Sequence, residues 1–243
     1  MRYWLVVPAA GAGRRFGDRI PKQYAALHGR TVLEWALAPF VSDTRCAGAV
    51  VVIAPSDTWW AKISERIPGV TVVQGGGERC ESVRGGLQAL NRKAQPSDWV
   101  LVHDGVRPCL ANADRDRLLE LAGAHPVGGL LAVRTSDTLK RAQSDGCVES
   151  TVDRAELWRA ATPQMFRYGR LCEALDRALA AKRIPTDESQ AMEWLGDRPL
   201  LVECSAGNIK ITTADDLALA EALLAARDKP SGKADKPGSK PTR

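Results

Sequence analysis

Short apolar runs alternate with longer amphipathic segments along most of the chain. Runs typical of strands buried on both faces of a sheet occupy residues 3–7, 49–54, 70–74, 98–103 and 127–134. Segments that we expect to be helical separate them, near residues 31–41, 57–66, 80–93 and 113–124. This alternation predicts an α/β fold, with a Rossmann-like, mostly parallel open sheet and crossover helices on both faces.

Residues 135–160 interrupt this alternation. The polar, turn-forming segment Gln143-Ser144-Asp145-Gly146 separates residues 138–141 from the run 148–152. A turn of this composition between two such runs predicts a β-hairpin that projects from the sheet.

The C-terminal part of the chain resumes the alternation of strands and helices. We expect a return to the sheet at 160–166, a helix near 168–182, a short helix after Thr186, a strand at 200–204 and a last helix after Thr213. Thr213 is a suitable N-cap for that last helix, and Asp215 and Asp216 in its first turn favour the helix dipole.

The length and charge of the chain indicate one folded unit and a polar tail. With 243 residues, of which 44% are hydrophobic, residues 1–227 can form one domain around one good-sized core. Residues 228–243 contain five Lys or Arg and two Asp but almost nothing apolar, so we expect a disordered basic tail. The tail carries +3 of the formal net charge of +5, and the +2 left on the folded part argues against nucleic acid as a partner.

The six cysteines are scattered at least 25 residues apart without a CxxC pair, and the chain has three histidines. This spacing argues against a zinc cluster and a disulfide framework, and it indicates the reducing cytoplasm. The apolar run after Arg2 is interrupted at Pro8, so we expect no signal peptide. No run approaches the roughly 18 apolar residues of a membrane helix, so we expect no membrane contact.

The first strand ends at Pro8 and runs into a turn of small residues, Ala9-Ala10-Gly11-Ala12-Gly13. Without bulky side chains, backbone N–H groups can approach an anion there. Glycines alone suit a plain turn equally well, but Arg15 and Lys22 add permanent positive charge beside this one. We therefore expect the turn to hold a polyphosphate.

Two familiar phosphate-binding loops do not fit this turn. A P-loop requires Gly-Lys-Ser/Thr to begin five residues after its first glycine, and the position five after Gly11 is Phe16. The third glycine of a dinucleotide-binding loop would also fall at Phe16, and residues 53–55, at the end of the next strand, offer no acid for a ribose. The pattern excludes kinase-type and NAD-type sites.

The segment Gly11-Ala12-Gly13-Arg14-Arg15, followed by Pro21-Lys22, is similar to the signature of sugar-nucleotide pyrophosphorylases and related nucleotidyltransferases. Further motifs follow in order: Lys22-Gln23-Tyr24, Gly75-Gly76-Gly77-Glu78-Arg79-Cys80-Glu81-Ser82-Val83, His103-Asp104-Gly105-Val106-Arg107-Pro108, Thr151-Val152-Asp153-Arg154, Thr162-Pro163-Gln164 and Asn208-Ile209-Lys210. Over residues 3–225 the chain therefore resembles the 2-C-methyl-D-erythritol 4-phosphate cytidylyltransferase family.

The resemblance implies transfer of CMP from CTP to 2-C-methyl-D-erythritol 4-phosphate in the non-mevalonate isoprenoid pathway. The products are 4-diphosphocytidyl-2-C-methyl-D-erythritol and pyrophosphate. The resemblance also implies a homodimer formed through the hairpin at 135–160. Ribitol 5-phosphate cytidylyltransferases share most of these motifs and are an alternative, and a catalytically silent nucleotide- or RNA-binding protein is the alternative outside the enzymes.

The resemblance assigns the nucleotide site to the first loop and to the second glycine-rich motif. Displacement of pyrophosphate concentrates negative charge at the α-phosphate, and Arg15 and Lys22 match the family residues that stabilise it. The backbone of residues 8–13 is expected to surround the base and the phosphates, and Gly75-Gly76 and Ser82 to contact the cytosine and ribose.

Asp104 follows the strand 98–103 and precedes Gly105. A carboxylate at that edge of a sheet can hold Mg²⁺ that bridges to phosphates, although a single Asp at a strand end is more often a turn former. The surrounding motif favours the magnesium site, and His103 is expected to support the turn rather than transfer protons.

The second substrate brings its own nucleophile, an ionised phosphate monoester, so it needs positioning rather than a general base. Arg154 and Lys210 match the two family residues that orient it, and Arg107, Thr138 and Thr162 match further contacts. An arginine can hold a phosphate bidentately, whereas a lysine acts as a point charge. Without the resemblance, Lys210 also fits an edge strand that faces water.

Overall fold

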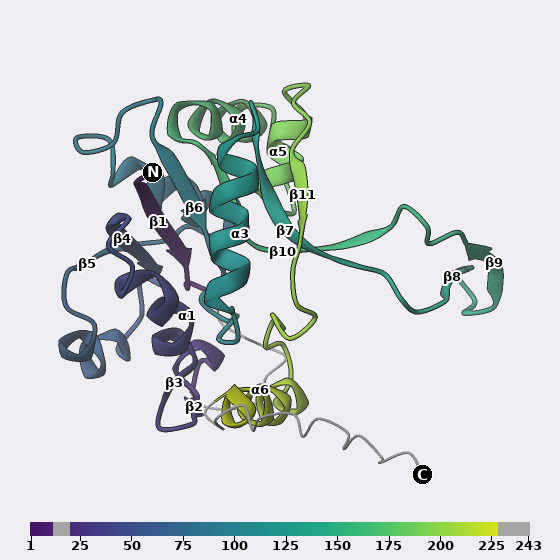
Figure 1. Ribbon diagram of the computed structural model, residues 1–243, viewed down its shortest axis with the longest axis horizontal. Coiled ribbons are helices and arrows are strands. Elements are labelled where there is room, and N and C mark those ends of the chain that lie inside the picture. Colours follow the sequence, from purple (N-terminus) through teal and green to yellow (C-terminus); the bar gives the residue numbers. More distant parts are fainter. Residues whose placement is uncertain (12–19, 228–243) are drawn as a thin grey trace, which may run out of the picture.

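Seven strands form the central sheet of the computed structural model, which describes residues 1–11 and 20–227 (Figure 1). Their order is β11-β7-β10-β6-β1-β4-β5. The strands span Tyr3–Pro8 (β1), Cys46–Ile53 (β4), Val70–Gln74 (β5), Trp99–Val102 (β6), Gly128–Arg134 (β7), Trp158–Arg167 (β10) and Leu200–Glu203 (β11). All run parallel except β10, which is antiparallel to both β6 and β7. The predicted mostly parallel α/β sheet is confirmed.

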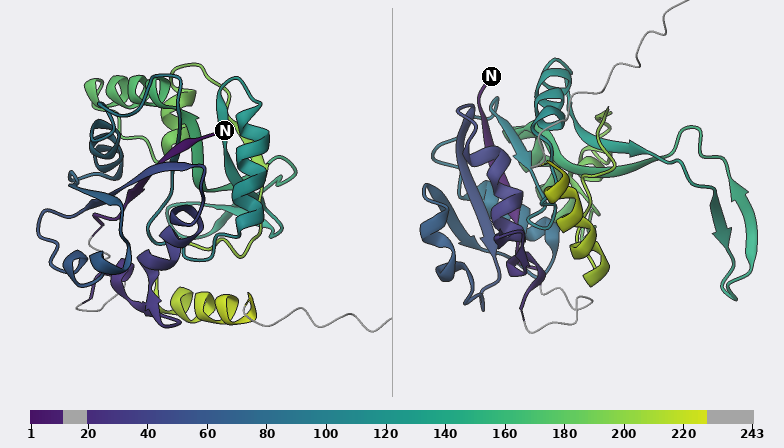
Figure 2. Two further views of the ribbon diagram at one scale, coloured as in Figure 1. Left: turned by 60° about the vertical axis from the view of Figure 1, so that its left-hand side comes forward. Right: turned by 60° about the horizontal axis from the view of Figure 1, so that its bottom comes forward.

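Helices cover both faces of this sheet (Figures 1 and 2). They span Val32–Val41 (α1), Arg79–Gln88 (α2), Asn112–Gly123 (α3), Tyr168–Ala180 (α4), Glu188–Glu193 (α5) and Ala214–Arg227 (α6). Alternate residues of β1 face opposite cores because successive side chains of a strand point to opposite faces. Leu5 and Val7 pack with residues of α1 and α3, whereas Val6 packs with residues of α2, α4 and α5.

The last helix, α6, begins with a reciprocal cap. The backbone N–H of Thr213 donates to Oδ2 of Asp216 at 2.8 Å, and the N–H of Asp216 donates to Oγ1 of Thr213 at 3.4 Å. This arrangement satisfies two N–H groups that a helix end otherwise leaves without partners. The predicted cap at Thr213 is confirmed.

Residues 57–66 do not form the predicted helix. They form two short 3₁₀ turns, Trp60–Lys62 (η2) and Ser64–Arg66 (η3). Oδ1 of Asp57 accepts hydrogen bonds from the N–H groups of Trp59 and Trp60, both at 2.9 Å, which favours a local turn over a regular helix. Pro68 then prevents the segment from continuing as a helix.

A β-hairpin projects from the main body of the molecule (Figures 1 and 2). Its strands, Leu139–Ala142 (β8) and Val148–Val152 (β9), pair antiparallel, and Gly146 occupies the turn with a φ of +85°. The predicted hairpin is therefore present, and we call residues 135–157 the arm. Every residue of β8 and β9 is exposed or half-buried, so the arm contributes little to the core of its own chain.

Three shorter elements complete the described chain: the 3₁₀ turn Lys22–Tyr24 (η1) and the paired strands Ala26–Leu27 (β2) and Arg30–Thr31 (β3). Within residues 1–11 and 20–227, no helix combines the length and apolar character needed to cross a bilayer. All six cysteines are free thiols. The predicted tail, residues 228–243, lies outside the described residues.

Candidate active site

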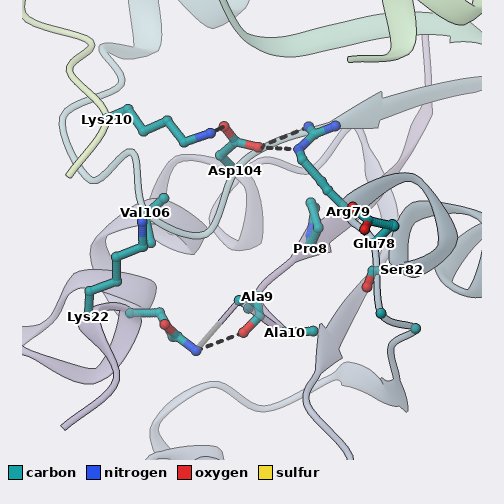
Figure 3. Close-up of a pocket in the computed structure, with 14 residues that line it drawn as sticks. Pro8, Ala9, Ala10, Lys22, Glu78, Arg79, Ser82, Asp104, Val106 and Lys210 are labelled. Atoms are coloured by element: carbon teal, nitrogen blue, oxygen red, sulfur yellow. Dashed lines mark hydrogen bonds and ion pairs between the residues drawn. The ribbon is translucent and has the colours of Figure 1, made fainter. Parts of the chain in front are cut away.

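A cavity of about 170 Å³ opens at the carboxyl ends of the parallel strands. Its lining residues are Pro8, Ala9, Ala10, Gly11, Lys22, Gln23, Gly76, Gly77, Glu78, Arg79, Ser82, Asp104, Val106 and Lys210 (Figure 3). Pro8 ends β1, Gly76 follows β5 and Asp104 follows β6. Open α/β sheets bind ligands at this edge, so the convergence of the first loop with Asp104 is as expected.

Hydrogen bonds hold the first loop against the sheet. The N–H of Ala9 donates to the carbonyl of Val52 at 2.7 Å, and the buried amide of Gln23 donates to the carbonyl of Ala9 at 2.8 Å. Gln23 thus fixes the backbone of the loop from the turn that also carries Lys22. The predicted site residues Ala12, Gly13 and Arg15 lie outside the described residues.

The second glycine-rich motif packs closely against the first loop. A Cβ at Gly75 would lie 2.5 Å from Oγ of Ser82 and 2.8 Å from Cβ of Ala10, and a Cβ at Gly76 would lie 2.6 Å from Cβ of Glu81. Real Cβ atoms essentially never lie so close to a neighbour, so a side chain at either position would force its surroundings to shift. The predicted nucleotide-binding residues Ala10 and Ser82 therefore lie side by side in the cavity wall, with Gly75 packed behind them.

Asp104 is a buried carboxylate surrounded by cations. Nε and NH2 of Arg79 lie 3.0 and 2.9 Å from its Oδ1, and Nζ of Lys210 lies 3.0 Å from its Oδ2 (Figure 3). Nε of Arg107 lies 3.6 Å from the same Oδ2. Burial by itself raises the pKa of Asp104, but the three cations more than offset it and hold that pKa well below its usual range. Asp104 is therefore ionised at any physiological pH.

His103 lies fully buried behind Asp104. Burial lowers the pKa of His103 to about 4, so its ring is neutral. Nε2 lies 3.1 Å from the carbonyl of Arg107 and must carry the hydrogen, which leaves Nδ1 to accept from the Thr162 hydroxyl at 3.1 Å. The same hydroxyl accepts from the N–H of Asp104 at 3.0 Å. His103 and Thr162 thus support the turn that presents Asp104.

Three hydrogen bonds hold residues 208–211, which include Lys210, against the turn that follows Asp104 and against Thr162. NH1 of Arg107 donates to the carbonyl of Asn208 at 2.7 Å, the Asn208 amide donates to the carbonyl of Thr162 at 2.8 Å, and the N–H of Ile211 donates to the carbonyl of Val106 at 2.9 Å. Residues 208–212 belong to no strand, so the alternative of a water-facing edge strand is wrong.

The sequence matches the family IspD, 2-C-methyl-D-erythritol 4-phosphate cytidylyltransferase, over residues 3–226. A relative of that name from Halorhodospira halophila is 51% identical over 232 residues, covering 93% of this chain and 95% of its own, and one from Ectopseudomonas mendocina is 48% identical over 230 residues, covering 94% and 98%. A crystal structure of 4-diphosphocytidyl-2C-methyl-D-erythritol synthase superposes with a TM-score of 0.81 at 41% identity, covering 92% of this chain and 98% of that one.

This chain belongs to the 2-C-methyl-D-erythritol 4-phosphate cytidylyltransferase family. It is a nucleotidyltransferase of the isoprenoid pathway, and the match disfavours the ribitol 5-phosphate alternative and the catalytically silent one.

Two predicted substrate contacts of this cytidylyltransferase lie away from the cavity. Thr138 and Arg154 are at the base of the arm, where NH1 of Arg154 donates to Oγ1 of Thr138 at 3.4 Å and both side chains are exposed. Neither residue lines the cavity of its own chain. The structure brings them to each other but not to Lys210.

Three buried or half-buried side chains of this cytidylyltransferase belong to the site although the sequence does not predict a role for them. Arg79 lines the cavity and binds Asp104, Glu188 binds Arg79, and Gln23 holds the first loop. Arg79 and Gln23 stand inside motifs that the resemblance already used, and a fixed cation beside a glycine-rich turn was the available signal. No such signal marks Glu188, because it is distant in sequence from Arg79 and lies in none of these motifs.

The donor set around Asp104 bears on the predicted magnesium site. Across the described ranges, no group of three or more His, Cys, Asp or Glu side chains could hold a metal. Mg²⁺ is commonly bound by one or two carboxylates together with substrate phosphates and water. Asp104 is one ionised carboxylate whose oxygens already bind Arg79, Lys210 and Arg107. It could therefore share a magnesium ion that arrives with a triphosphate, but the protein alone does not form a magnesium site.

Proposed function

We propose that this cytidylyltransferase joins its two substrates by direct in-line transfer. A phosphate oxygen of 2-C-methyl-D-erythritol 4-phosphate attacks the α-phosphorus of CTP, the new P–O bond forms, and the bond to the β-phosphate breaks to release pyrophosphate. The observation that carries this proposal is the grouping of Lys22, Arg79 and Lys210 around one cavity with the first loop and Asp104. Cations placed in advance stabilise the charge that develops there.

The chemistry needs no protein base. The attacking phosphate is already ionised at neutral pH, and neither nearby titratable group can take a proton efficiently. His103 is buried with both ring nitrogens engaged, and three cations keep the pKa of Asp104 far too low. Positioning and charge therefore account for the catalysis that we propose.

The cations divide into two proposed sets. Lys22, together with Arg15, which lies outside the described residues, stabilises the charge at the α-phosphate. Lys210 orients the attacking phosphate, and Arg107 adds positive charge beside that phosphate. Thr162 has its hydroxyl engaged by two partners, so we propose that it supports the substrate site through Asp104.

We propose Asp104 as the protein ligand of Mg²⁺ that accompanies CTP. When bound, the ion would neutralise phosphate charge and make pyrophosphate a better leaving group. Pro8, Ala9, Ala10 and Gly11 would then surround the nucleotide, with Gly76 and Ser82 beside its base and ribose and Gly75 permitting their close approach.

The arm supports a proposal about assembly. Thr138 and Arg154 are exposed and absent from the cavity of their own chain, so we propose a homodimer in which each arm brings these residues to the partner's cavity. A closed two-fold dimer would exchange both arms in the same way. We also propose a cytoplasmic location, which the six free thiols favour.

Mixed dimers test the shared site. Chains with Arg154→Ala and chains with Lys22→Ala are unfolded together, refolded and assayed for pyrophosphate release. With shared sites, half of the dimers carry one intact site, so activity recovers to about a quarter of the wild-type value. Mixtures that stay as inactive as the separate variants would show that both residues serve one chain.

The acceptor is tested by offering 2-C-methyl-D-erythritol 4-phosphate and ribitol 5-phosphate separately with CTP and Mg²⁺. We expect pyrophosphate release to be faster with the first acceptor over the whole range of concentrations. Faster turnover of ribitol 5-phosphate would overturn the proposed acceptor while leaving the cytidylyl transfer intact.

A further inference from the structure

Glu188 is the first residue of α5 and is only 1% exposed. Its carboxylate accepts two hydrogen bonds from one guanidinium: NH1 of Arg79 donates to Oε1 at 2.6 Å and NH2 donates to Oε2 at 3.1 Å. Such a fork holds both the position and the plane of an arginine. Glu188 is separated from Arg79 by more than 100 residues of sequence, yet it binds two nitrogens of its guanidinium.

The same guanidinium reaches Asp104 with its other edge. Nε and NH2 of Arg79 lie 3.0 and 2.9 Å from Oδ1 of Asp104, so Arg79 bridges two buried carboxylates. Arg79 also forms part of the cavity wall, with 27% of its side chain exposed. Its orientation therefore affects both the shape of the cavity and the charge balance at Asp104.

Glu188 is itself held on a firm support. Asp187 accepts from the N–H of Gln190 at 2.9 Å and from the amide of Gln164 at 3.0 Å, and the N–H of Ser189 donates to Oε1 of Gln164 at 2.8 Å. Gln164 lies on β10, opposite Val102 of β6, and Asp104 lies two residues after the end of β6. Asp104 thus follows β6, while the start of α5, which carries Glu188, is held by Gln164 of the neighbouring strand β10.

We propose that Glu188 is a positioning residue that orients Arg79. It thereby keeps Asp104 and the part of the cavity wall formed by Arg79 in the geometry that binds CTP. Without the Glu188 charge, Arg79 is free to pair more fully with Asp104 or to turn into the cavity. Either change disturbs the nucleotide site before it disturbs the acceptor site. This inference rests on the proposed role of the cavity in CTP binding.

The test is a double-mutant cycle in the full-length chain, with Glu188→Gln, Arg79→Gln and the double variant. We expect Glu188→Gln to lower kcat/KM for CTP by about tenfold or more, with a much smaller change in KM for the acceptor. In the Arg79→Gln background, Glu188→Gln should lower kcat/KM for CTP by less than about twofold, because the arginine that Glu188 orients is absent. Equal costs in the two backgrounds would overturn the proposal.

Glu193→Gln is the matched control. Glu193 ends the same helix and is exposed. Its Oε1 accepts a hydrogen bond from the hydroxyl of Ser189 at 2.7 Å, and the residue does not line the cavity. We expect this variant to retain wild-type kcat/KM. A loss as large as that of Glu188→Gln would assign the effect to the helix and not to Arg79.

Two further measurements keep the test decisive. Glu188→Asp retains the charge, so it should recover part of the loss, and it replaces Glu188→Gln if that variant does not fold in a thermal melt. Calorimetric titration with Mg²⁺–CTP reports the nucleotide site without turnover and should show weakened binding in Glu188→Gln. An inactive wild type would refute the proposed function, whereas unchanged binding and turnover in Glu188→Gln would refute this inference alone.

Discussion

Nζ of Lys210 lies 3.0 Å from Oδ2 of Asp104, although the two residues are more than 100 positions apart in the chain. Asp104 is 7% exposed and Lys210 39% exposed at the side chain, so the carboxylate is buried beneath an ammonium group that still reaches the cavity. This pair leaves no buried charge unpaired, and it places the ammonium group where we propose that the acceptor phosphate binds.

Replacement of Lys210 by Gln should therefore impair catalysis far more than folding. Arg79 and Arg107 still face Asp104 in that variant, so the buried carboxylate keeps partners. We expect kcat to fall by about 10²- to 10³-fold, which is the usual effect of one donor placed at developing charge. Pyrophosphate release measures the fall, and Lys93→Gln, an exposed lysine outside the cavity, is the control. Unfolding of Lys210→Gln at room temperature would contradict this separation.

Lys22→Ala should cause a loss of the same order, about 10²- to 10³-fold in kcat. The proposed reason is different, since Lys22 acts on the triphosphate and Lys210 on the acceptor. KM for the acceptor should rise in Lys210→Gln and stay near wild type in Lys22→Ala. A rise of that KM in both variants would refute the division between the two cations.

His103 gives a prediction about pH. Burial lowers its pKa to about 4, whereas an unfolded histidine titrates near 6.5. Between these values the unfolded chain binds a proton that the folded chain does not, so stability falls as pH drops from 6.5 to 4. The loss should reach about 3 kcal/mol and be absent from His103→Gln. Urea unfolding of both proteins at several pH values from 7 to 4 measures the difference.

The same variant tests the absence of a general base. Gln can still donate to the carbonyl of Arg107, so we expect His103→Gln to keep activity within about tenfold of wild type. A loss as large as that of Lys22→Ala would instead assign proton transfer to His103.

Gly75→Ala should weaken the nucleotide site selectively. Its methyl group would meet Oγ of Ser82 at 2.5 Å and Cβ of Ala10 at 2.8 Å, so the wall of the cavity must shift. We expect KM for CTP to rise by about tenfold or more, as one misplaced contact can cause. Gly85→Ala, whose methyl group would meet its nearest neighbour at an ordinary 3.7 Å, is the control and should behave as wild type.

Deletion of residues 228–243 separates the enzyme from an RNA-binding alternative. These residues carry +3 of the formal net charge of +5 and lie outside the described residues. We expect the shortened protein to keep wild-type kcat and KM. Loss of activity on deletion, with Lys22→Ala unaffected, would reverse the assignment.

Local patterns in the sequence were sufficient for the fold class and for the order of most elements. The apolar run of β1, the turn at Gly146 and the cap at Thr213 each act within a few residues, so propensity and spacing predict them. The helix expected at 57–66 is absent because the Asp57 carboxylate accepts hydrogen bonds from two nearby backbone N–H groups, which favours a turn. The first loop and Asp104 were placed at one edge of the sheet by strand direction alone.

Motifs along the chain supply the residue types of the site: a small-residue loop, fixed cations and an acid at the end of a strand. Folding selects which of these residues meet in the buried site. It placed Lys210 and Arg79 on Asp104, bound Arg79 to Glu188, and left Arg154 on an arm outside its own cavity. The physical reason is that charge pairing in a buried site depends on distances between segments far apart in the chain, which spacing along the chain does not encode.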